Sequence, residues 1–286
     1  MTVGAHTAQQ TWPAPAKLNL FLHITGQRPD GYHDLQTLFQ ILDWGDELHF
    51  NVNDSGKITR SCNIDGIAES EDICVRAAKL LQDRCHVVKG VHIDLQKNIP
   101  MGAGLGGGSS DAATVLVALN KLWSCGQSQQ QLAEMGLELG ADVPVFVHGH
   151  SALAQGRGEK LQAVSLTPRY YLLVFPGFAV STAQVFQHPG LKRDSKPIDM
   201  ASAGLQPGRN DCEAVVMEMH PQLKTLAQAI SSWGTVRMSG TGSTLFLSFA
   251  DKKAAIGAAS ELKCRYNVRP VEGVDCSPLL KVLERV

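Results

Sequence analysis

The sequence lacks the patterns that mark secreted proteins, zinc sites and membrane spans. Its seven cysteines are odd in number and form no C-x-x-C pair, and its ten histidines include no H-E-x-x-H motif. Scattered cysteines of this kind indicate free thiols in a reducing compartment and no resident metal site. No apolar run approaches the ~18–20 residues that cross a bilayer, and the first residues show neither a basic nor an apolar signal region. We therefore expect a cytoplasmic protein.

An excess of charge of either sign is also missing. The 26 lysines and arginines nearly balance the 27 aspartates and glutamates, so the net charge is −1. This balance provides no electrostatic surface for duplex nucleic acid or an anionic membrane, and nothing in the sequence specifies a protein partner. With 44% hydrophobic and 19% charged residues, the chain can build an ordinary core. Its 286 residues suggest one large domain or two ordinary ones.

Strand-like and helix-like periods occur together along the chain. Short apolar or alternating runs predict strands at residues 16–24, 37–41, 47–52, 91–96, 145–147, 152–154, 170–174, 236–239 and 244–249. A period near 3.6 predicts helices at residues 72–82, 112–123, 129–139, 211–219, 222–231 and 252–262. Because strands and helices do not alternate regularly, the pattern favours an α+β fold over a doubly wound sheet. The strand at 170–174 runs into Pro176-Gly177, so we expect two domains, residues 1–164 and 165–286.

The strongest signal is a glycine-rich segment that opens into a helix. Five of the seven residues from Gly102 to Gly108 are glycine, which allows positive φ angles and lets several N–H groups point toward one place. We expect Ser109 or Ser110 to cap the helix and Asp111 to lie in its first turn. A helix N-terminus preceded by exposed amides predicts an anion site, and the usual anion is phosphate.

Other interpretations of this loop have to be weighed. A mobile surface loop is the plainest one, but such loops rarely run straight into a well capped helix. Gly102-x-Gly104-x-x-Gly107 matches the dinucleotide fingerprint of oxidoreductases, yet no acidic ribose anchor follows ~20 residues later. No Gly-Lys-Ser/Thr follows the glycines, and the protein-kinase motifs H-R-D and D-F-G are missing. A nucleoside triphosphate loop of another type is therefore the favoured interpretation.

Two charged residues stand in apolar surroundings. Lys17 interrupts an apolar strand in which Lys17 and Asn19 share one face, while Leu18, Leu20 and Leu22 share the other. That polar face is either exposed to solvent or part of a site. Asp142 lies in G-A-D-V-P-V-F, where it is either a cap or turn residue or a catalytic carboxylate whose ionisation depends on a cationic partner.

The loop sequence P-M-G-A-G-L-G-G-G-S-S-D-A-A from residue 100 closely resembles the phosphate loop of the GHMP kinases, the small-molecule kinases that include galactokinase, homoserine kinase and mevalonate kinase. Further segments resemble one branch of this superfamily: P-A-K-L-N-L at 15–20, R-P-D-G-Y-H-D-L-Q-T at 28–37, G-A-D-V-P-V-F at 140–146 and M-S-G-T-G-S at 238–243. The resemblance extends from about residue 14 to 249. It implies an α+β kinase domain followed by a ferredoxin-like C-terminal domain.

The resemblance also implies an activity and its cofactors. Members of this branch phosphorylate the 2-hydroxyl of 4-diphosphocytidyl-2-C-methyl-D-erythritol with ATP and Mg²⁺, a step in the non-mevalonate route to isoprenoid precursors. Asp142 is then the catalytic base and Lys17 its partner, which keeps the carboxylate ionised and polarises the hydroxyl. The resemblance further implies that ATP is bound by Pro100, Met101, Gly102, Ala103, Gly104, Leu105, Gly106, Gly107, Gly108, Ser109 and Ser110. Ser109 or Ser110 could also ligate Mg²⁺, whereas no convincing acidic ligand is visible.

The substrate-binding residues follow from the same resemblance. Tyr32 stacks on the cytosine, His33 pairs with its edge, and Phe186 supplies a second aromatic ring. Asn19 would orient the substrate or Lys17, and Thr182 is a weaker candidate. Gly240, Thr241 and Gly242 belong to the third motif of the superfamily, which closes over the phosphates and the substrate. Without the resemblance, Tyr32 and His33 are turn residues, Phe186 is a core residue, 240–243 is a hairpin turn and Asn210-Asp211 is a helix cap. The segment Asp72-Ile73 is the expected region of adenine contact.

The nearer alternative is another kinase of the superfamily, similar to homoserine kinase or mevalonate kinase. A small acyclic substrate needs no aromatic pocket, so Tyr32, His33 and Phe186 separate the two hypotheses.

Overall fold

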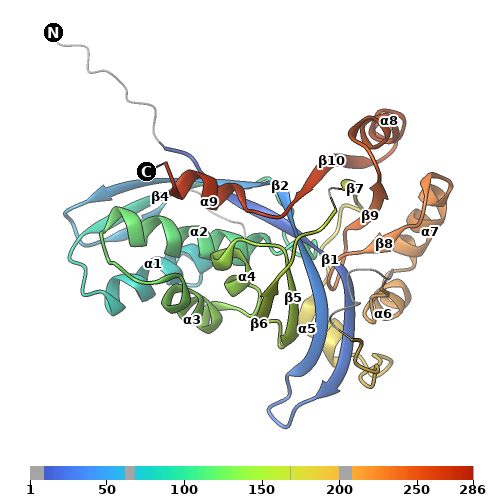
Figure 1. The fold of residues 1–286 in the computed structure, drawn as a ribbon, viewed down its shortest axis with the longest axis horizontal. Helices are drawn as coiled ribbons and strands as arrows, with labels where there is room; N and C mark the ends of the chain where they lie inside the picture. The colour runs from blue at the N-terminus through green and yellow to red at the C-terminus, as the bar shows by residue number, and fades with distance from the viewer. Residues whose placement is uncertain (1–9, 62–67, 168, 200–207, 286) are drawn as a thin grey trace.

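In the computed structural model, which describes residues 10–61, 68–167, 169–199 and 208–285, helices and strands are mixed along the chain (Figure 1). The strands are β1 (Trp12–Gln27), β2 (His33–Asn53), β3 (Ile58–Arg60), β4 (Gly90–Gln96), β5 (Ala152–Gly156), β6 (Lys160–Ala163), β7 (Tyr170–Phe175), β8 (Arg237–Met238), β9 (Leu245–Phe249) and β10 (Asn267–Val274). The helices are α1 (Ile73–Arg84), α2 (Gly107–Leu122), α3 (Gln129–Leu139), α4 (Val143–His148), α5 (Thr182–Gln187), α6 (Glu213–Met219), α7 (Pro221–Ile230), α8 (Lys252–Leu262) and α9 (Pro278–Leu283). This mixture confirms the predicted α+β class.

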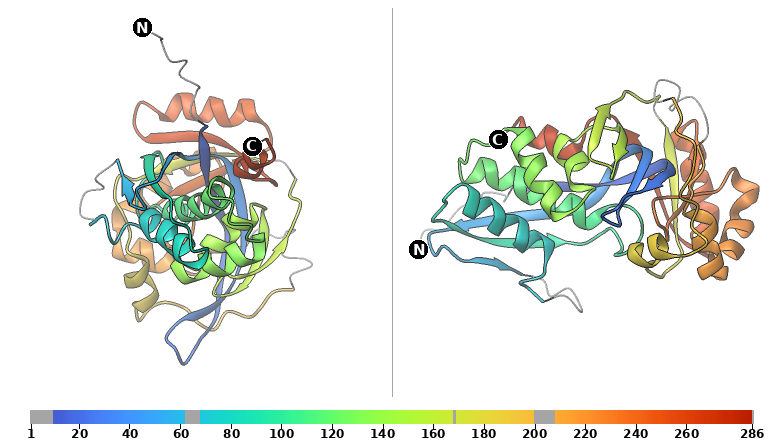
Figure 2. Two further views of the ribbon diagram at one scale, coloured as in Figure 1. Left: turned by 90° about the vertical axis from the view of Figure 1, so that its left-hand side faces the viewer. Right: turned by 90° about the horizontal axis from the view of Figure 1, so that it is seen from below.

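The long strand β2 organises the sheet. It pairs with β1, β4, β5 and β10, and the path through the sheet runs β3-β4-β2-β10-β7-β9-β8. Strand β10 pairs with β2 through Gly273 and Val274 and with β7 along most of its length. It therefore joins the strands of the first half of the chain to those of the second, and the two halves lie side by side in Figure 2.

Two large apolar cores lie mainly in one half of the chain each, and a smaller one joins Leu18 and Leu105 of the first half to Tyr171 and Phe246 of the second. Helices α1 to α4 contribute buried residues to the first core together with β1, β2 and β4. The second core is built mainly from β7, β9 and α6 to α8, and Leu22 and Ile24 of β1 also belong to it. Helix α9 returns to the first core, where Leu279 is fully buried. The expected domain boundary after residue 164 lies between β6 and β7. It stays a prediction, because helix α9, near the end of the chain, packs in the first core and not in the second.

Several predicted elements have the expected bounds, and others do not. Helices α3 and α8 span the predicted residues, whereas the strands expected at 37–41 and 47–52 are parts of one strand, β2. The strand expected at 145–147 is wrong, because these residues form helix α4, with Pro144 in its first turn. A short run of apolar residues shows no hydrophobic periodicity, so it cannot distinguish a strand from a helix. Elements β3, β6, α5, β10 and α9 were not predicted.

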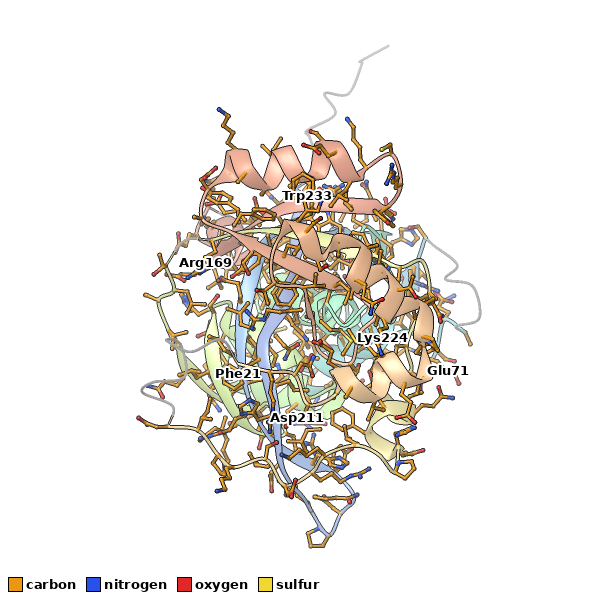
Figure 3. All side chains as sticks on the ribbon, turned by 90° about the vertical axis from the view of Figure 1, so that its right-hand side faces the viewer. Phe21, Glu71, Arg169, Asp211, Lys224 and Trp233 are labelled. Carbon is orange, nitrogen blue, oxygen red and sulfur yellow. The ribbon has the colours of Figure 1, made fainter. Side chains whose placement is uncertain are left out.

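The expected helix caps also need correction. Helix α2 has Gly106 as its N-cap, in the left-handed region and without a side-chain bond, so Ser109 and Ser110 lie inside the helix. Asp111 follows the first turn and instead binds Lys97. The Asp211 carboxylate does not cap α6. It accepts a hydrogen bond from the Ile24 N–H of β1 at 2.8 Å, and Figure 3 shows Asp211 beside that strand.

Two glycines predict opposite effects on stability. A Cβ on Gly45 would lie 2.0 Å from the carbonyl oxygen of Ala14, where β1 and β2 pair closely. We expect Gly45→Ala to lower the free energy of unfolding by at least about 1–3 kcal/mol. Gly257, inside helix α8, has open space at the Cβ position, so Gly257→Ala should raise it by about 0.5–1 kcal/mol. Urea unfolding of both variants checks this, and destabilisation of equal size would contradict it.

Candidate active site

One cavity of about 1160 Å³ brings together most of the residues predicted from the sequence. It is lined by Lys17, Asn19, Tyr32, His33, residues 100–109, Asp142, Thr182, Phe186, Gly240 and Thr241. Ser110 and Gly242 are not part of this lining. Ser110 is buried within α2, and a Cβ on Gly242 would point at Met238 and Val216. Their assignment to the site stays a prediction.

The glycine loop has the backbone geometry of an anion site. Gly102, Gly104 and Gly106 have φ angles of 62°, 74° and 73°. The N–H of Ser110 donates to the Gly106 carbonyl at 2.9 Å. The N–H groups that precede it, at residues 107–109, therefore have no acceptor within α2. Together with the helix dipole they favour an anion at this end of the cavity.

The loop is held firmly against the second half of the chain. A Cβ on Gly104 would lie 2.2 Å from the carbonyl oxygen of Ser239, and one on Gly106 would lie 2.9 Å from the Phe146 ring. The Ser239 hydroxyl donates to the Gly104 carbonyl at 2.9 Å, and the Thr244 N–H donates to the Ala103 carbonyl at 3.1 Å. These contacts argue against a mobile surface loop.

Lys17 lies at the floor of the cavity beside the loop. Its side chain is 4% exposed, and its Nζ is 3.4 Å from Oδ2 of Asp142. The same ammonium donates to the Gly104 carbonyl at 3.2 Å and to Oδ1 of Asn19, and it lies over the Phe39 ring. The alternative of a solvent-exposed face is therefore wrong, because Lys17 and Asn19 are both buried.

Asp142 keeps its carboxylate available. It occupies the N-cap position of α4, but its side chain makes no capping hydrogen bond. The side chain is 34% exposed and lines the cavity. Because the Asp142 carboxylate makes no hydrogen bond to the helix, it can interact with the Lys17 ammonium and with a ligand in the cavity.

Asn19 holds Lys17 in place. Its Oδ1 accepts from Lys17, and its Nδ2 donates to Oγ1 of Thr37 at 2.9 Å. Because both ends of the amide already have protein partners, the contacts support a role in orienting Lys17 more than a direct role in holding substrate.

The opposite end of the cavity is aromatic. The ring centroids of His33 and Phe186 are 5.1 Å apart, with an angle of 31° between the rings. Tyr32 is 53% exposed, and the Arg157 guanidinium lies 4.2 Å from its ring centroid. His33 is only 8% exposed. Burial and then the charge of Arg193 lower the pKa of His33 below its usual value, so the imidazole is neutral near pH 7.

A third segment closes over Lys17 from the second half. A Cβ on Gly240 would lie 3.5 Å from Nζ of Lys17. The amide of Asn210 donates to the Gly240 carbonyl at 2.7 Å, and the hydroxyls of Thr182 and Thr241 are 2.9 Å apart. Residues 240 and 241 therefore form one wall of the cavity, with Thr182 of α5 attached to it.

Sequence reasoning did not identify three basic residues of the cavity, Lys97, Arg157 and Arg193. Lys97 pairs with the carboxylates of Asp46 and Asp111, the latter at 2.8 Å. Burial raises the pKa of Asp111 to about 8, against the attraction of Lys97. The only sequence signal for Lys97 is its place between an alternating strand and the glycine loop. The arginines carry no local signal.

The expected adenine region is also at the cavity. Residues 71–74 line it, but the Asp72 carboxylate already caps α1 and pairs with Arg60 at 3.0 Å. Among the described residues, no group of three histidine, cysteine or acidic side chains could hold a metal ion. In the same part of the chain, no helix is both long and apolar enough to cross a membrane.

Comparison with known families agrees with this geometry. Residues 72–150 match the family described as GHMP kinases N terminal domain, and residues 196–268 match GHMP kinases C terminal. The chain belongs to the GHMP kinases. It is therefore an ATP-dependent small-molecule kinase.

Individual relatives carry a more specific name. The chain is 47% identical over 269 residues to the 4-diphosphocytidyl-2-C-methyl-D-erythritol kinase of Shewanella woodyi, covering 94% of this chain and 95% of that one. A crystal structure of 4-(cytidine 5'-diphospho)-2C-methyl-D-erythritol kinase is similar, with a TM-score of 0.80 and 34% identity over 93% of this chain and all of that one. Homoserine kinase from Cytophaga hutchinsonii, with a TM-score of 0.70 and 15% identity over 97% of this chain and 98% of that one, shares the fold.

Gly108 offers a clean test of the anion site. A Cβ there would find Ile73 at 3.9 Å and nothing closer, whereas side chains at 104 and 106 would clash with the protein itself. We expect Gly108→Val to fold normally and to weaken ATP binding at least tenfold, because its side chain points into space meant for nucleotide. Calorimetry with ATP, with thermal unfolding as the control, measures both. Wild-type ATP affinity in the folded variant would overturn the assignment.

Proposed function

We propose that this kinase transfers the γ-phosphoryl group of ATP to the 2-hydroxyl of 4-diphosphocytidyl-2-C-methyl-D-erythritol, giving the 2-phosphate and ADP. The observation that carries the proposal is that one cavity combines two kinds of site. An anion site and the Lys17–Asp142 pair lie at one end, and the aromatic residues Tyr32, His33 and Phe186 lie at the other. The names of the relatives at 47% and 34% identity support the same reaction.

Asp142 and Lys17 can perform the chemical step together. The hydroxyl oxygen attacks the γ-phosphorus, its proton passes to the Asp142 carboxylate, and the bond to the β–γ bridging oxygen breaks as ADP leaves. The Lys17 ammonium, 3.4 Å from the carboxylate, orients Asp142 and draws electron density from the hydroxyl. Free N–H groups at residues 107–109 stabilise the charge on the phosphates.

Mg²⁺ is part of this proposal as the ion that accompanies ATP. It is typically bound through substrate phosphates and one or two protein groups, and it neutralises charge on the transferred group. Of the two candidate serines, Ser109 lines the cavity, so its hydroxyl is the protein group that we assign to the ion.

The aromatic residues suit a pyrimidine base. Tyr32 presents an exposed ring, and the paired rings of His33 and Phe186 lie in the same cavity. Stacking of a base on an aromatic ring contributes about 1–3 kcal/mol. A substrate such as homoserine or mevalonate has no base to place there, and the likeness to homoserine kinase at 15% identity concerns the fold alone.

A coupled assay of ADP formation tests the proposal directly. The enzyme is supplied with ATP and, in turn, with cytidine diphosphate alcohols, homoserine, mevalonate and simple alcohols. We expect turnover with 4-diphosphocytidyl-2-C-methyl-D-erythritol that exceeds turnover with the other alcohols by several orders of magnitude. Preferred turnover of homoserine or mevalonate would establish the alternative.

The Lys17–Asp142 pair predicts coupled kinetic effects. Asp142→Asn keeps the shape of the side chain but removes the proton acceptor, so kcat should fall by about 10²–10⁴ while substrate binding is largely kept. Lys17→Met should lower kcat comparably, since it removes the charge and fills the buried space. The double variant should be far less impaired than the product of the two effects, because the residues act as a unit.

Single-turnover kinetics with saturating ATP measure this cycle. Asp54→Asn is the matched control, since Asp54 is exposed in the turn after β2. Near-wild-type chemistry in Asp142→Asn would exclude general-base catalysis there, and strictly multiplicative effects would show that the two residues act independently.

His33 predicts a selective effect on one substrate. His33→Ala removes a hydrogen-bonding group from a nearly buried position, which costs about 1–3 kcal/mol. We therefore expect KM for the cytidylyl substrate to rise by roughly 5–150-fold, with KM for ATP almost unchanged. His150→Ala, at an exposed position outside the cavity, is the control. Equal increases in both KM values would mean that His33 only supports the fold.

A further inference from the structure

Arg193 makes contacts that fix its guanidinium against His33. Its Nε donates to Nε2 of His33 at 3.0 Å. Its Nη1 donates to the Leu191 carbonyl at 3.0 Å, and its Nη2 donates to the carbonyls of Phe186 and His188 at 2.9 and 3.0 Å. All three nitrogens therefore have protein acceptors, and the direction in which Nε points is set by the backbone around it.

The chain that carries Arg193 is itself anchored. Ser195 donates its N–H to the Ile24 carbonyl of β1 at 3.0 Å, and its hydroxyl donates to the buried Asp211 carboxylate. Strand β1 pairs with β2, where Gln27 lies opposite His33. Arg193 and His33 are thus connected to the same two strands, so their mutual position is part of the fold.

This contact determines which nitrogen of His33 carries the hydrogen. A guanidinium has donors only, so Nε2 must offer its lone pair to Arg193. A neutral imidazole has one N–H, which then lies on Nδ1. Among the described residues Nδ1 has no hydrogen-bond partner, and His33 lines the cavity. The side chain therefore offers a bound base a hydrogen-bond donor.

We propose that Arg193 makes this site select cytosine over uracil, by holding His33 as the tautomer that donates from Nδ1. The inference rests on the proposed function, since it concerns the base of that substrate. Cytosine has acceptors at N3 and O2, whereas uracil carries an N–H at N3. A donating Nδ1 pairs with N3 of cytosine and faces a second donor in uracil, which leaves polar groups unpaired in a desolvated site.

The first test compares CDP and UDP binding by calorimetry, together with kcat/KM for the cytidine and uridine forms of the diphosphate alcohol. We expect the wild type to prefer the cytidine forms at least 100-fold. In Arg193→Met, His33 is free to move its hydrogen to Nε2, so this preference should fall at least tenfold. Arg193→Lys retains a donor and should restore most of the preference.

Arg157→Met is the matched control, because Arg157 is the other arginine of the aromatic end and lies over Tyr32. It should weaken binding of both nucleotides alike and leave their ratio unchanged. If Arg193→Met also lowers both affinities equally, Arg193 only supports the loop, and the proposal is overturned.

The second test observes the tautomer itself. In ¹⁵N-histidine NMR spectra, with the His33 signals assigned from His33→Gln, we expect the wild type to show hydrogen on Nδ1 and Arg193→Met to show a larger share on Nε2. Hydrogen on Nε2 in the wild type would refute the proposal. Tight and selective CDP binding without turnover of the diphosphate alcohol would contradict the proposed reaction and still support this role of Arg193.

Discussion

The buried ammonium of Lys17 is the interaction on which the active site depends. Removing such a charge from water costs several kcal/mol unless partners surround it. Its partners come from separate parts of the chain: Asn19 in β1, Gly104 in the glycine loop and Asp142 at the start of α4. The contacts that compensate the buried charge are therefore the same contacts that place the anion site beside the carboxylate, so catalytic geometry and core stability arise together.

The glycines of the loop meet two different demands. At Gly104 and Gly106 positive φ coincides with close approach to Ser239 and Phe146, so these glycines allow the loop to pack against neighbouring elements. Gly108 is different, because it lines the cavity and the nearest atom to a Cβ there belongs to Ile73, at 3.9 Å. A run of glycines in a sequence does not tell which of them allow close packing and which leave space for a ligand. That distinction requires the positions of the neighbouring atoms.

The parts of this protein that could be predicted are those encoded by local pattern. The bounds of α3 and α8 follow from long regular periods, and most residues of the predicted site share one cavity. The helix at α4 was missed because its apolar run is too short to show a period, and the α2 cap was misplaced because a left-handed glycine took the place expected of serine. Arg193 contacts His33 across 160 positions of sequence, and no local pattern carries such a pairing.

The paired strands β1 and β2 link the two ends of the cavity. Lys17 lies opposite Ile41 in this ladder, and His33 lies opposite Gln27. The spacing between the reacting pair and the aromatic end is therefore fixed by backbone hydrogen bonds and cannot adjust to a shorter substrate. A molecule that reaches both ends can use base recognition to orient its hydroxyl against Asp142, which is how remote binding energy raises the rate of a chemical step. A small alcohol that binds beside Lys17 alone lacks this source of orientation, so the length of the site itself contributes to selectivity.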